Sequence, residues 1–137
     1  MIDYSKPDFV AEVERITEGR KCDVVYDAVG KDTFPASLDC LRPRGMFVSF
    51  GNASGPVPPF PIGMLSQKGS LFATRPTLFS YIATRAELEE SANALFEVVS
   101  KGIVQIRVNQ RYPLAEAARA HDDLEGRKTT GATVLIP

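Results

Sequence analysis

The hydrophobic positions of this chain follow two periods that alternate along its length. Apolar residues three or four positions apart mark helices, and short apolar runs between turn residues mark strands. The helical spacing predicts helices over residues 6–18, 33–41, 61–67, 85–101 and 114–125. The apolar runs predict strands over residues 22–29, 46–50, 70–74, 103–108 and 132–136.

The long helix has the clearest local signal. Thr84 and Glu87 have the spacing of a capping box, in which each side chain hydrogen-bonds to the backbone of the other residue. Gly102 then ends the helix. Earlier in the chain, the run Arg42-Pro43-Arg44-Gly45 predicts a turn before the second strand.

The alternation of strands and helices predicts the fold class. Crossovers of roughly ten residues or more are typical of parallel βαβ units, so we expect an α/β fold with a doubly wound parallel sheet. Dinucleotide-binding folds of this class open with a strand and a glycine-rich turn that holds the pyrophosphate. This chain opens with a predicted helix, and we therefore expect a partial, Rossmann-like sheet that lacks its first βαβ unit.

Composition and charge narrow the function classes. The chain has 137 residues, 44% of them hydrophobic, and a formal net charge of −1, which excludes a disordered tail. A charge so close to zero gives no general attraction to nucleic acid or to anionic lipid. We find no apolar stretch long enough for a membrane span and no hydrophobic signal core, and we expect a cytoplasmic protein.

The thiols and the single histidine do not form a metal-ligand pattern. Cys22, Cys40 and His121 match no zinc-ligand spacing, and two cysteines are too few for a disulfide framework. We interpret both cysteines as small buried hydrophobic residues. His121 shares a helix face with leucine and alanine residues, which favours a partly buried structural histidine over a general acid.

Several runs together resemble a known family. They are Val25-Tyr26-Asp27-Ala28-Val29-Gly30, the segments 37–45, 48–55, 67–71, 74–78, 112–114 and 120–121, and the closing residues 131–137. The chain resembles, over almost its whole length, the NADPH-dependent quinone oxidoreductases of the zinc-free branch of the medium-chain dehydrogenase/reductase superfamily. Members of that family carry a catalytic domain and the glycine-rich phosphate loop upstream, so the resemblance implies a carboxy-terminal portion of an enzyme.

The resemblance also implies a domain organisation and an activity. Residues 1–102 correspond to a partial nucleotide-binding domain, and residues 103–137 to a carboxy-terminal segment that returns toward the catalytic domain. The activity would be hydride transfer from NADPH to a quinone or a related unsaturated carbonyl compound. The implied site contains no metal ligand and no catalytic residue within this chain, and we expect the chain alone to be inactive.

The implied cofactor residues fall into several groups, each with a purely structural alternative. Asn52 and Gly30, which follows Ala28 closely, are also common turn residues, and Thr77 is also a common helix cap. Tyr4 and Arg127 are equally typical of an exposed surface without a ligand. The family uses main-chain groups around Pro76 for the nicotinamide carboxamide. The full set of implied NADPH residues is Tyr4, Ala28, Ser49, Phe50, Gly51, Asn52, Pro76, Thr77, Leu78 and Arg127.

One alternative interpretation stays open, and a second is disfavoured. A catalytically inactive remnant could act as an interaction module, because the predicted strand over residues 22–29 would have an unpaired edge, through which we expect a homodimer. Asp27, Ser49 and Lys68 superficially match the phosphoacceptor site of receiver domains, but Lys68 precedes its strand instead of following it.

Overall fold

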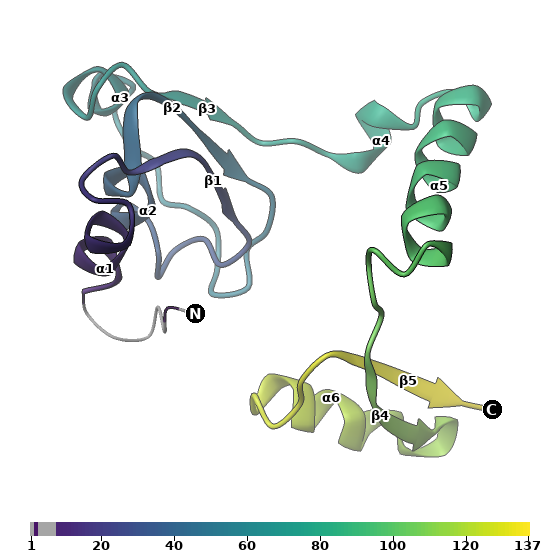
Figure 1. The fold of residues 1–137 in the computed structure, drawn as a ribbon. Helices are drawn as coiled ribbons and strands as arrows, with labels where there is room; N and C mark the ends of the chain where they lie inside the picture. Colours follow the sequence, from purple (N-terminus) through teal and green to yellow (C-terminus); the bar gives the residue numbers. More distant parts are fainter. Residues whose placement is uncertain (1, 3–7) are drawn as a thin grey trace. The chain divides into compact units, whose positions relative to one another are not determined.

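The computed structural model describes residues 2 and 8–137 (Figure 1). It divides into two compact units, Met1–Tyr81 and Ile82–Pro137, which we describe separately. The predicted boundary between residues 102 and 103 stays a prediction. Within the described part of the chain, no helix has the length and apolar character needed to cross a membrane.

The first unit is built on a three-stranded parallel sheet. Strands β1 (Cys22–Asp27), β2 (Leu41–Ser49) and β3 (Phe72–Thr74) lie in the order β1-β2-β3. Phe47 on the central strand pairs with Val25 on one side and with Ala73 on the other. The three carboxyl ends therefore meet at one edge of the sheet, as predicted for parallel βαβ units.

The β2 strand is longer than the sequence predicted. The predicted turn over residues 42–45 lies inside it, because the pairing with β1 jumps from Cys22↔Leu41 to Val24↔Met46. The extra residues form an irregularity of the bulge type, and Arg44 takes a φ of 61° there. The Arg44 N–H instead donates to the Gly69 carbonyl at 2.8 Å. The turn prediction was therefore wrong in kind, although it located the irregular segment.

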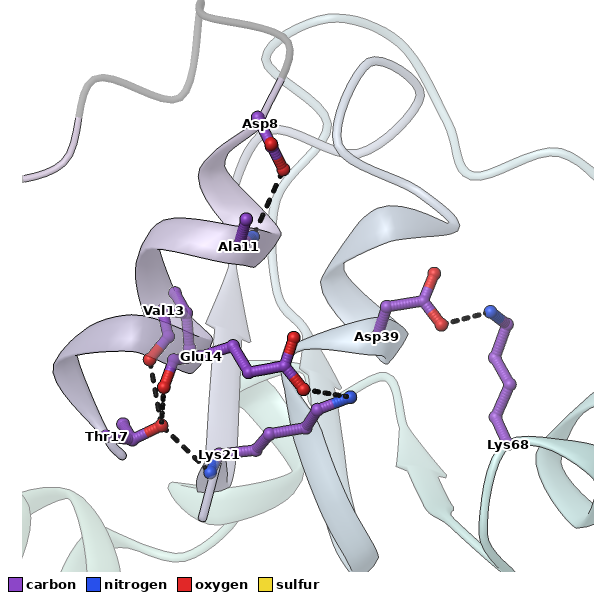
Figure 2. A network of polar contacts seen from close by, with 8 residues as sticks. All are labelled: Asp8, Ala11, Val13, Glu14, Thr17, Lys21, Asp39 and Lys68. Carbon is purple, nitrogen blue, oxygen red and sulfur yellow. Dashed lines mark hydrogen bonds and ion pairs between the residues drawn. The ribbon is translucent and has the colours of Figure 1, made fainter. Parts of the chain in front are cut away.

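The helices of this unit are short. They are α1 (Phe9–Ile16), α2 (Ala36–Asp39), α3 (Gly63–Gln67) and α4 (Leu78–Tyr81). The side chain of Asp8 caps α1 by accepting a hydrogen bond from the Ala11 N–H at 3.2 Å (Figure 2). At the other end of α1, the Thr17 hydroxyl donates to the Val13 carbonyl at 2.8 Å and accepts from the Lys21 N–H at 2.9 Å.

Two ion pairs link the ends of these helices to neighbouring segments. Lys21 lies 3.8 Å from a carboxylate oxygen of Glu14, and Lys68 pairs with Asp39 at the end of α2 (Figure 2). Exposed pairs of this kind contribute little stability. The unit depends more on a small apolar core between the sheet and α2, in which Leu38 is completely buried. The core residues are Phe34, Leu38, Leu41, Phe47 and Leu71.

The second unit contains one long helix and one βαβ unit. Its elements are α5 (Arg85–Ser100), β4 (Val108–Pro113), a 3₁₀ turn (Leu114–Glu116), α6 (Ala117–Glu125) and β5 (Ala132–Ile136). The capping box of Thr84 and Glu87 at the start of α5 is confirmed. Strands β4 and β5 pair in parallel, with Val108 opposite Ala132.

Two predictions fail in this unit. The strand predicted over residues 103–108 begins only at Val108, because pairing with β5 starts there and the apolar residues Ile103 and Ile106 are exposed. His121 is exposed, not partly buried, since its neighbours on the apolar stripe, Leu114 and Leu124, are themselves more than half exposed. The helical spacing was correct, but the described chain places nothing over that stripe.

Candidate functional site

The carboxyl end of β1 is fixed by a single buried carboxylate. Asp27 is only 4% exposed. Its Oδ1 accepts hydrogen bonds from the Val29 and Gly30 N–H groups at 2.8 and 2.9 Å. Its Oδ2 accepts from the Thr33 and Ser37 hydroxyls, both at 2.7 Å. Burial alone raises the pKa of this carboxyl, but the four hydrogen bonds outweigh it and hold the pKa below the ordinary value.

The backbone of the same segment holds the loop that follows β2. The Asp27 carbonyl accepts from the Phe50 and Gly51 N–H groups at 2.9 and 3.3 Å, and the Ala28 carbonyl accepts from Ala53 at 3.1 Å. A Cβ at Gly51 would lie 2.5 Å from the Ala28 carbonyl oxygen, so only glycine allows this approach. The segments after β1 and β2 therefore form one interlocked edge.

A groove of about 620 Å³ lies at this edge of the sheet. Its walls are mainly apolar, with a proline-rich loop on one side and the ends of β2 and β3 on the other. Its lining residues are Phe47, Ser49, Asn52, Pro56, Val57, Pro58, Pro59, Phe60, Ala73, Thr74 and Arg75. An apolar cleft with a few polar groups at the carboxyl ends of parallel strands is the usual form of a ligand site in open α/β sheets.

Arg75 connects two strand ends beside the groove. Its Nη1 donates to the Ser49 carbonyl at 2.8 Å and approaches the Gly51 carbonyl at 3.4 Å. Its Nε and Nη2 have no hydrogen-bond partner among residues 2 and 8–137, and the side chain is exposed. The groove therefore has one cationic group with N–H donors left for an acceptor on a ligand.

The structure brings together part of the predicted set. Ser49 and Asn52 line the groove, and Ala28, Phe50 and Gly51 lie at the same interlocked edge. Phe50 is half exposed and packs edge-to-face against Tyr26, with ring centroids 6.4 Å apart.

Three further predicted residues of the first unit are absent from the lining of the groove. Pro76, Thr77 and Leu78 directly follow Arg75 but are not among the lining residues. Tyr4 lies outside the described residues, and Arg127 belongs to the second unit. The predicted contacts of all these residues with a cofactor stay predictions.

Sequence reasoning did not assign Arg75 or the proline-rich loop to the site, and it did not identify the structural role of Asp27. A signal was present for Arg75, since it directly follows a predicted strand at the edge where ligands bind. Phe60 lines the groove and packs against Phe34, with ring centroids 4.9 Å apart. The two residues are far apart in the sequence, so no local pattern predicts this contact. The receiver-like interpretation fails, because Lys68 pairs with Asp39 and the Asp27 carboxylate is buried in its own hydrogen bonds.

Arg127 occupies an unusual backbone position at the end of α6. The Arg127 N–H donates to the Leu124 carbonyl at 3.1 Å, and the Lys128 N–H donates to the Asp123 carbonyl at 2.9 Å. These two bonds form a Schellman motif, in which the residue after the cap is left-handed and is usually glycine. Here Gly126 is the cap and Arg127 takes the left-handed position with φ 55°. Among the described residues, no hydrogen bond or ion pair involves its guanidinium.

The parallel α/β sheet, with its groove at the carboxyl edge, defines a nucleotide-binding domain of the Rossmann-like class. Comparison with known proteins gives the family. The sequence pattern of the family described as zinc-binding dehydrogenase matches residues 1–135, and the chain belongs to this family.

Individual relatives agree with this assignment. A quinone oxidoreductase of Pseudomonas aeruginosa is 57% identical over 136 residues, which are 99% of this chain and 42% of the relative. A 2-haloacrylate reductase of Burkholderia is 47% identical over 99% of this chain and 41% of its own length. The crystal structure of Escherichia coli quinone oxidoreductase complexed with NADPH matches with a TM-score of 0.93 and 51% identity, over 99% of this chain and 42% of that one. The chain thus spans less than half the length of these relatives.

The family description mentions zinc, but the residues that the structure describes do not fit a zinc site. Within the described residues, no three His, Cys, Asp or Glu side chains are grouped to hold a metal ion. Cys40 is buried, and burial first, with smaller effects from Cys22 and Asp39, raises the pKa of its thiol to about 11. In this structure Cys40 therefore packs as a small buried hydrophobic residue, as predicted.

The Asp27 hydrogen bonds give a test of the site's foundation. We expect Asp27→Asn to lower the free energy of unfolding by about 2 kcal/mol. The amide nitrogen of asparagine donates hydrogen bonds, so it cannot accept the two that one carboxylate oxygen of Asp27 accepts. Asp32→Asn, at an exposed acid five residues later, is the matched control and should change little. Chemical denaturation of the three proteins measures both effects.

The same experiment has a pH dependence with a defined sign. Because folding lowers the pKa of Asp27, its contribution is complete above the unfolded value of about 4 and is lost as the pH falls through the lower folded value. The stability difference between the natural chain and Asp27→Asn should therefore shrink below about pH 4. A difference that stays constant down to pH 2 would contradict this account.

The left-handed turn at Arg127 gives a second prediction. Arg127→Gly should stabilise the protein by about 1 kcal/mol, because glycine adopts positive φ without the clash of a Cβ. Arg127→Ala removes the guanidinium but keeps the Cβ, so it should give no such gain. Thermal unfolding of both variants compares them directly, and equal melting temperatures would show that the backbone at this position is unstrained.

Proposed function

We propose that this chain is the nucleotide-binding portion of an oxidoreductase that transfers a hydride from NADPH to a quinone or a related unsaturated carbonyl compound. The observation that carries the proposal is the groove at the carboxyl edge of the sheet, with Asn52 and Arg75 as polar groups among apolar walls. The proposal is also supported by the E. coli quinone oxidoreductase, whose structure was solved with NADPH and matches almost the entire chain.

The residues of the groove fit a nicotinamide nucleotide. The Asn52 amide offers a donor and an acceptor, and Arg75 offers free N–H groups. Ser49 and Asn52 line the groove, and Gly51 allows the loop that carries Asn52 to close on the Ala28 backbone. We assign Pro76, Thr77, Leu78, Arg127 and Tyr4 to the same cofactor on the family resemblance. NADPH supplies the hydride, and these residues bind and orient it.

The chemistry shared by the relatives supports the proposed substrate class. A quinone and a 2-haloacrylate both contain a carbon–carbon double bond conjugated to an electron-withdrawing carbonyl or carboxyl group. Such a compound accepts a hydride at carbon and a proton afterwards. We assign no residue of this chain as the proton donor. The cytoplasmic location of the protein stays a prediction from the sequence.

A second candidate function is supported by the open edge of β1. In the described part of the chain, β1 pairs only with β2, and its residues Val24 and Tyr26 are 39% and 72% exposed. An unpaired strand edge with apolar side chains is a template for another strand. We propose that this edge pairs two copies of the chain, whether or not the chain also binds NADPH.

The cofactor proposal predicts a loss of binding in two variants. In the natural protein that carries this chain, Asn52→Ala and Arg75→Ala should each weaken NADPH binding by about threefold to tenfold, because each removes one hydrogen-bonding group. Asn93→Ala, at an exposed residue of α5, is the control. Fluorescence titration with NADPH gives the dissociation constants.

The activity arm of that experiment tests the reaction class. The same natural protein should oxidise NADPH only when a quinone or an unsaturated carbonyl compound is added, whereas the 137-residue chain alone should show weak binding and no turnover. Turnover by the purified chain would overturn its predicted inactivity. Absence of NADPH binding by the natural protein would overturn the proposed function.

The dimer proposal predicts a concentration-dependent mass. Light scattering of the 15.0 kDa chain at micromolar concentration should give twice the monomer mass. Tyr26→Lys should shift it to the monomer, because a charged lysine on an edge strand opposes pairing. Tyr81→Lys makes the same change at an exposed residue of α4 and should leave the dimer intact. A monomer for the unchanged chain is the result that rejects this interface.

A further inference from the structure

The carboxylate of Asp123 holds the turn that carries Arg127. Its Oδ2 accepts a hydrogen bond from the Tyr112 hydroxyl at 2.9 Å, and its Oδ1 lies 3.1 Å from the Lys128 ammonium. Tyr112 is a buried residue of β4, and Lys128 directly follows Arg127. We call Tyr112, Asp123 and Lys128 the Asp123 cluster. It ties the strand, the helix and the turn to one another.

The position of Asp123 is unfavourable for the helix itself. It lies in the last turn of α6, where the helix dipole disfavours a negative charge. The hydrogen bond from Lys128, and after it that from Tyr112, hold the pKa of Asp123 below its ordinary value. Because Asp123 is unfavourable for the helix dipole but pairs with Lys128, we interpret it as a residue that stabilises the turn and not the helix.

The cluster also separates the two neighbouring cations. Lys128 is engaged by Asp123, whereas the Arg127 guanidinium has no polar partner among the described residues. The backbone of Arg127 is left-handed, and the two Schellman hydrogen bonds fix it there. The turn therefore holds an arginine in a backbone conformation that glycine usually adopts, and the guanidinium is left available to a ligand.

We propose that Asp123 is a positioning residue for Arg127. It fixes the left-handed turn and occupies Lys128, so that the guanidinium alone is presented to an anionic ligand. This inference rests on the proposed function, in which the ligand is the phosphate-bearing cofactor NADPH. Arginine suits this task because its fixed fork of N–H donors matches phosphate oxygens.

The first test compares two neighbouring acids in the natural protein that carries this chain. Asp123→Asn should weaken NADPH binding by about threefold to tenfold, and Lys128→Met, which removes the same pair from its other side, should act in the same direction. Asp122→Asn is the matched control. It removes an equal charge at the neighbouring residue, whose side chain is not part of the Asp123 cluster. Removing a negative charge by itself would strengthen the binding of an anion. Weakening in Asp123→Asn together with no weakening in Asp122→Asn therefore supports positioning.

The second test asks whether Asp123 acts through Arg127. In an Arg127→Ala background, Asp123→Asn should have no further effect on the NADPH dissociation constant, whereas a purely structural effect would persist and add. Additive effects, or unchanged binding in Asp123→Asn, overturn the proposal.

A readout without NADPH separates this inference from the proposed function. Trypsin cleaves after arginine and lysine in mobile segments, so cleavage after Arg127 should be faster in Asp123→Asn than in Asp122→Asn. Equal cleavage rates would overturn the positioning role even if NADPH binds. If the natural protein fails to bind NADPH while cleavage differs as expected, the proposed function fails and the control of the turn by Asp123 stands.

Discussion

The site edge of the first unit depends on the burial of one negative charge. A carboxylate removed from water is costly unless its oxygens are fully hydrogen-bonded, and Asp27 meets this requirement with four donors. Those donors come from the turn after β1, from Thr33 and from the start of α2. The carboxylate therefore sets the direction in which the chain leaves the sheet, and α2 then brings Leu38 into the core.

The glycines of the edge follow from this arrangement. Once Asp27 fixes residues 28–30, the loop after β2 can close only by lying directly on the Ala28 backbone, and Gly51 is the residue that permits it. Gly30 is constrained in the same way, since a Cβ there would lie 2.3 Å from the Gly55 carbonyl oxygen. Arg75 completes the edge by joining the end of β3 to the Ser49 carbonyl. The groove is thus a consequence of backbone packing, and its polar groups are added at the rim.

The sequence predicts those parts of the fold that local patterns determine. The capping box at Thr84 and the apolar run of β1 each specify an element by themselves, and these elements are confirmed. The spacing of Phe34, Leu38 and Leu41 predicted a helix over residues 33–41, but only Ala36–Asp39 is helical, because Leu41 already lies in β2 and pairs with Cys22. The bulge in β2 and the start of β4 depend on which residues pair with a distant strand, so apolar runs placed them wrongly. For the site, the strand-end residues Ser49 and Asn52 were found from the rule for parallel sheets and the resemblance. The position of Arg75 after a predicted strand was a usable signal, but its contact with the Ser49 carbonyl spans 26 residues of sequence and no local pattern shows it.

The two units use a carboxylate for the same purpose but in different surroundings. Asp27 is buried, and hydroxyl and backbone groups donate hydrogen bonds to both of its oxygens. Neither salt nor small changes of pH near neutrality therefore alter these hydrogen bonds. Asp123 is partly exposed and holds its turn through an ion pair with Lys128, which mobile ions can screen. The first unit therefore has an edge whose geometry is built into the core. The second has a turn whose ion pair responds to the surface charge around it, and in our proposal the presentation of Arg127 depends on that pair.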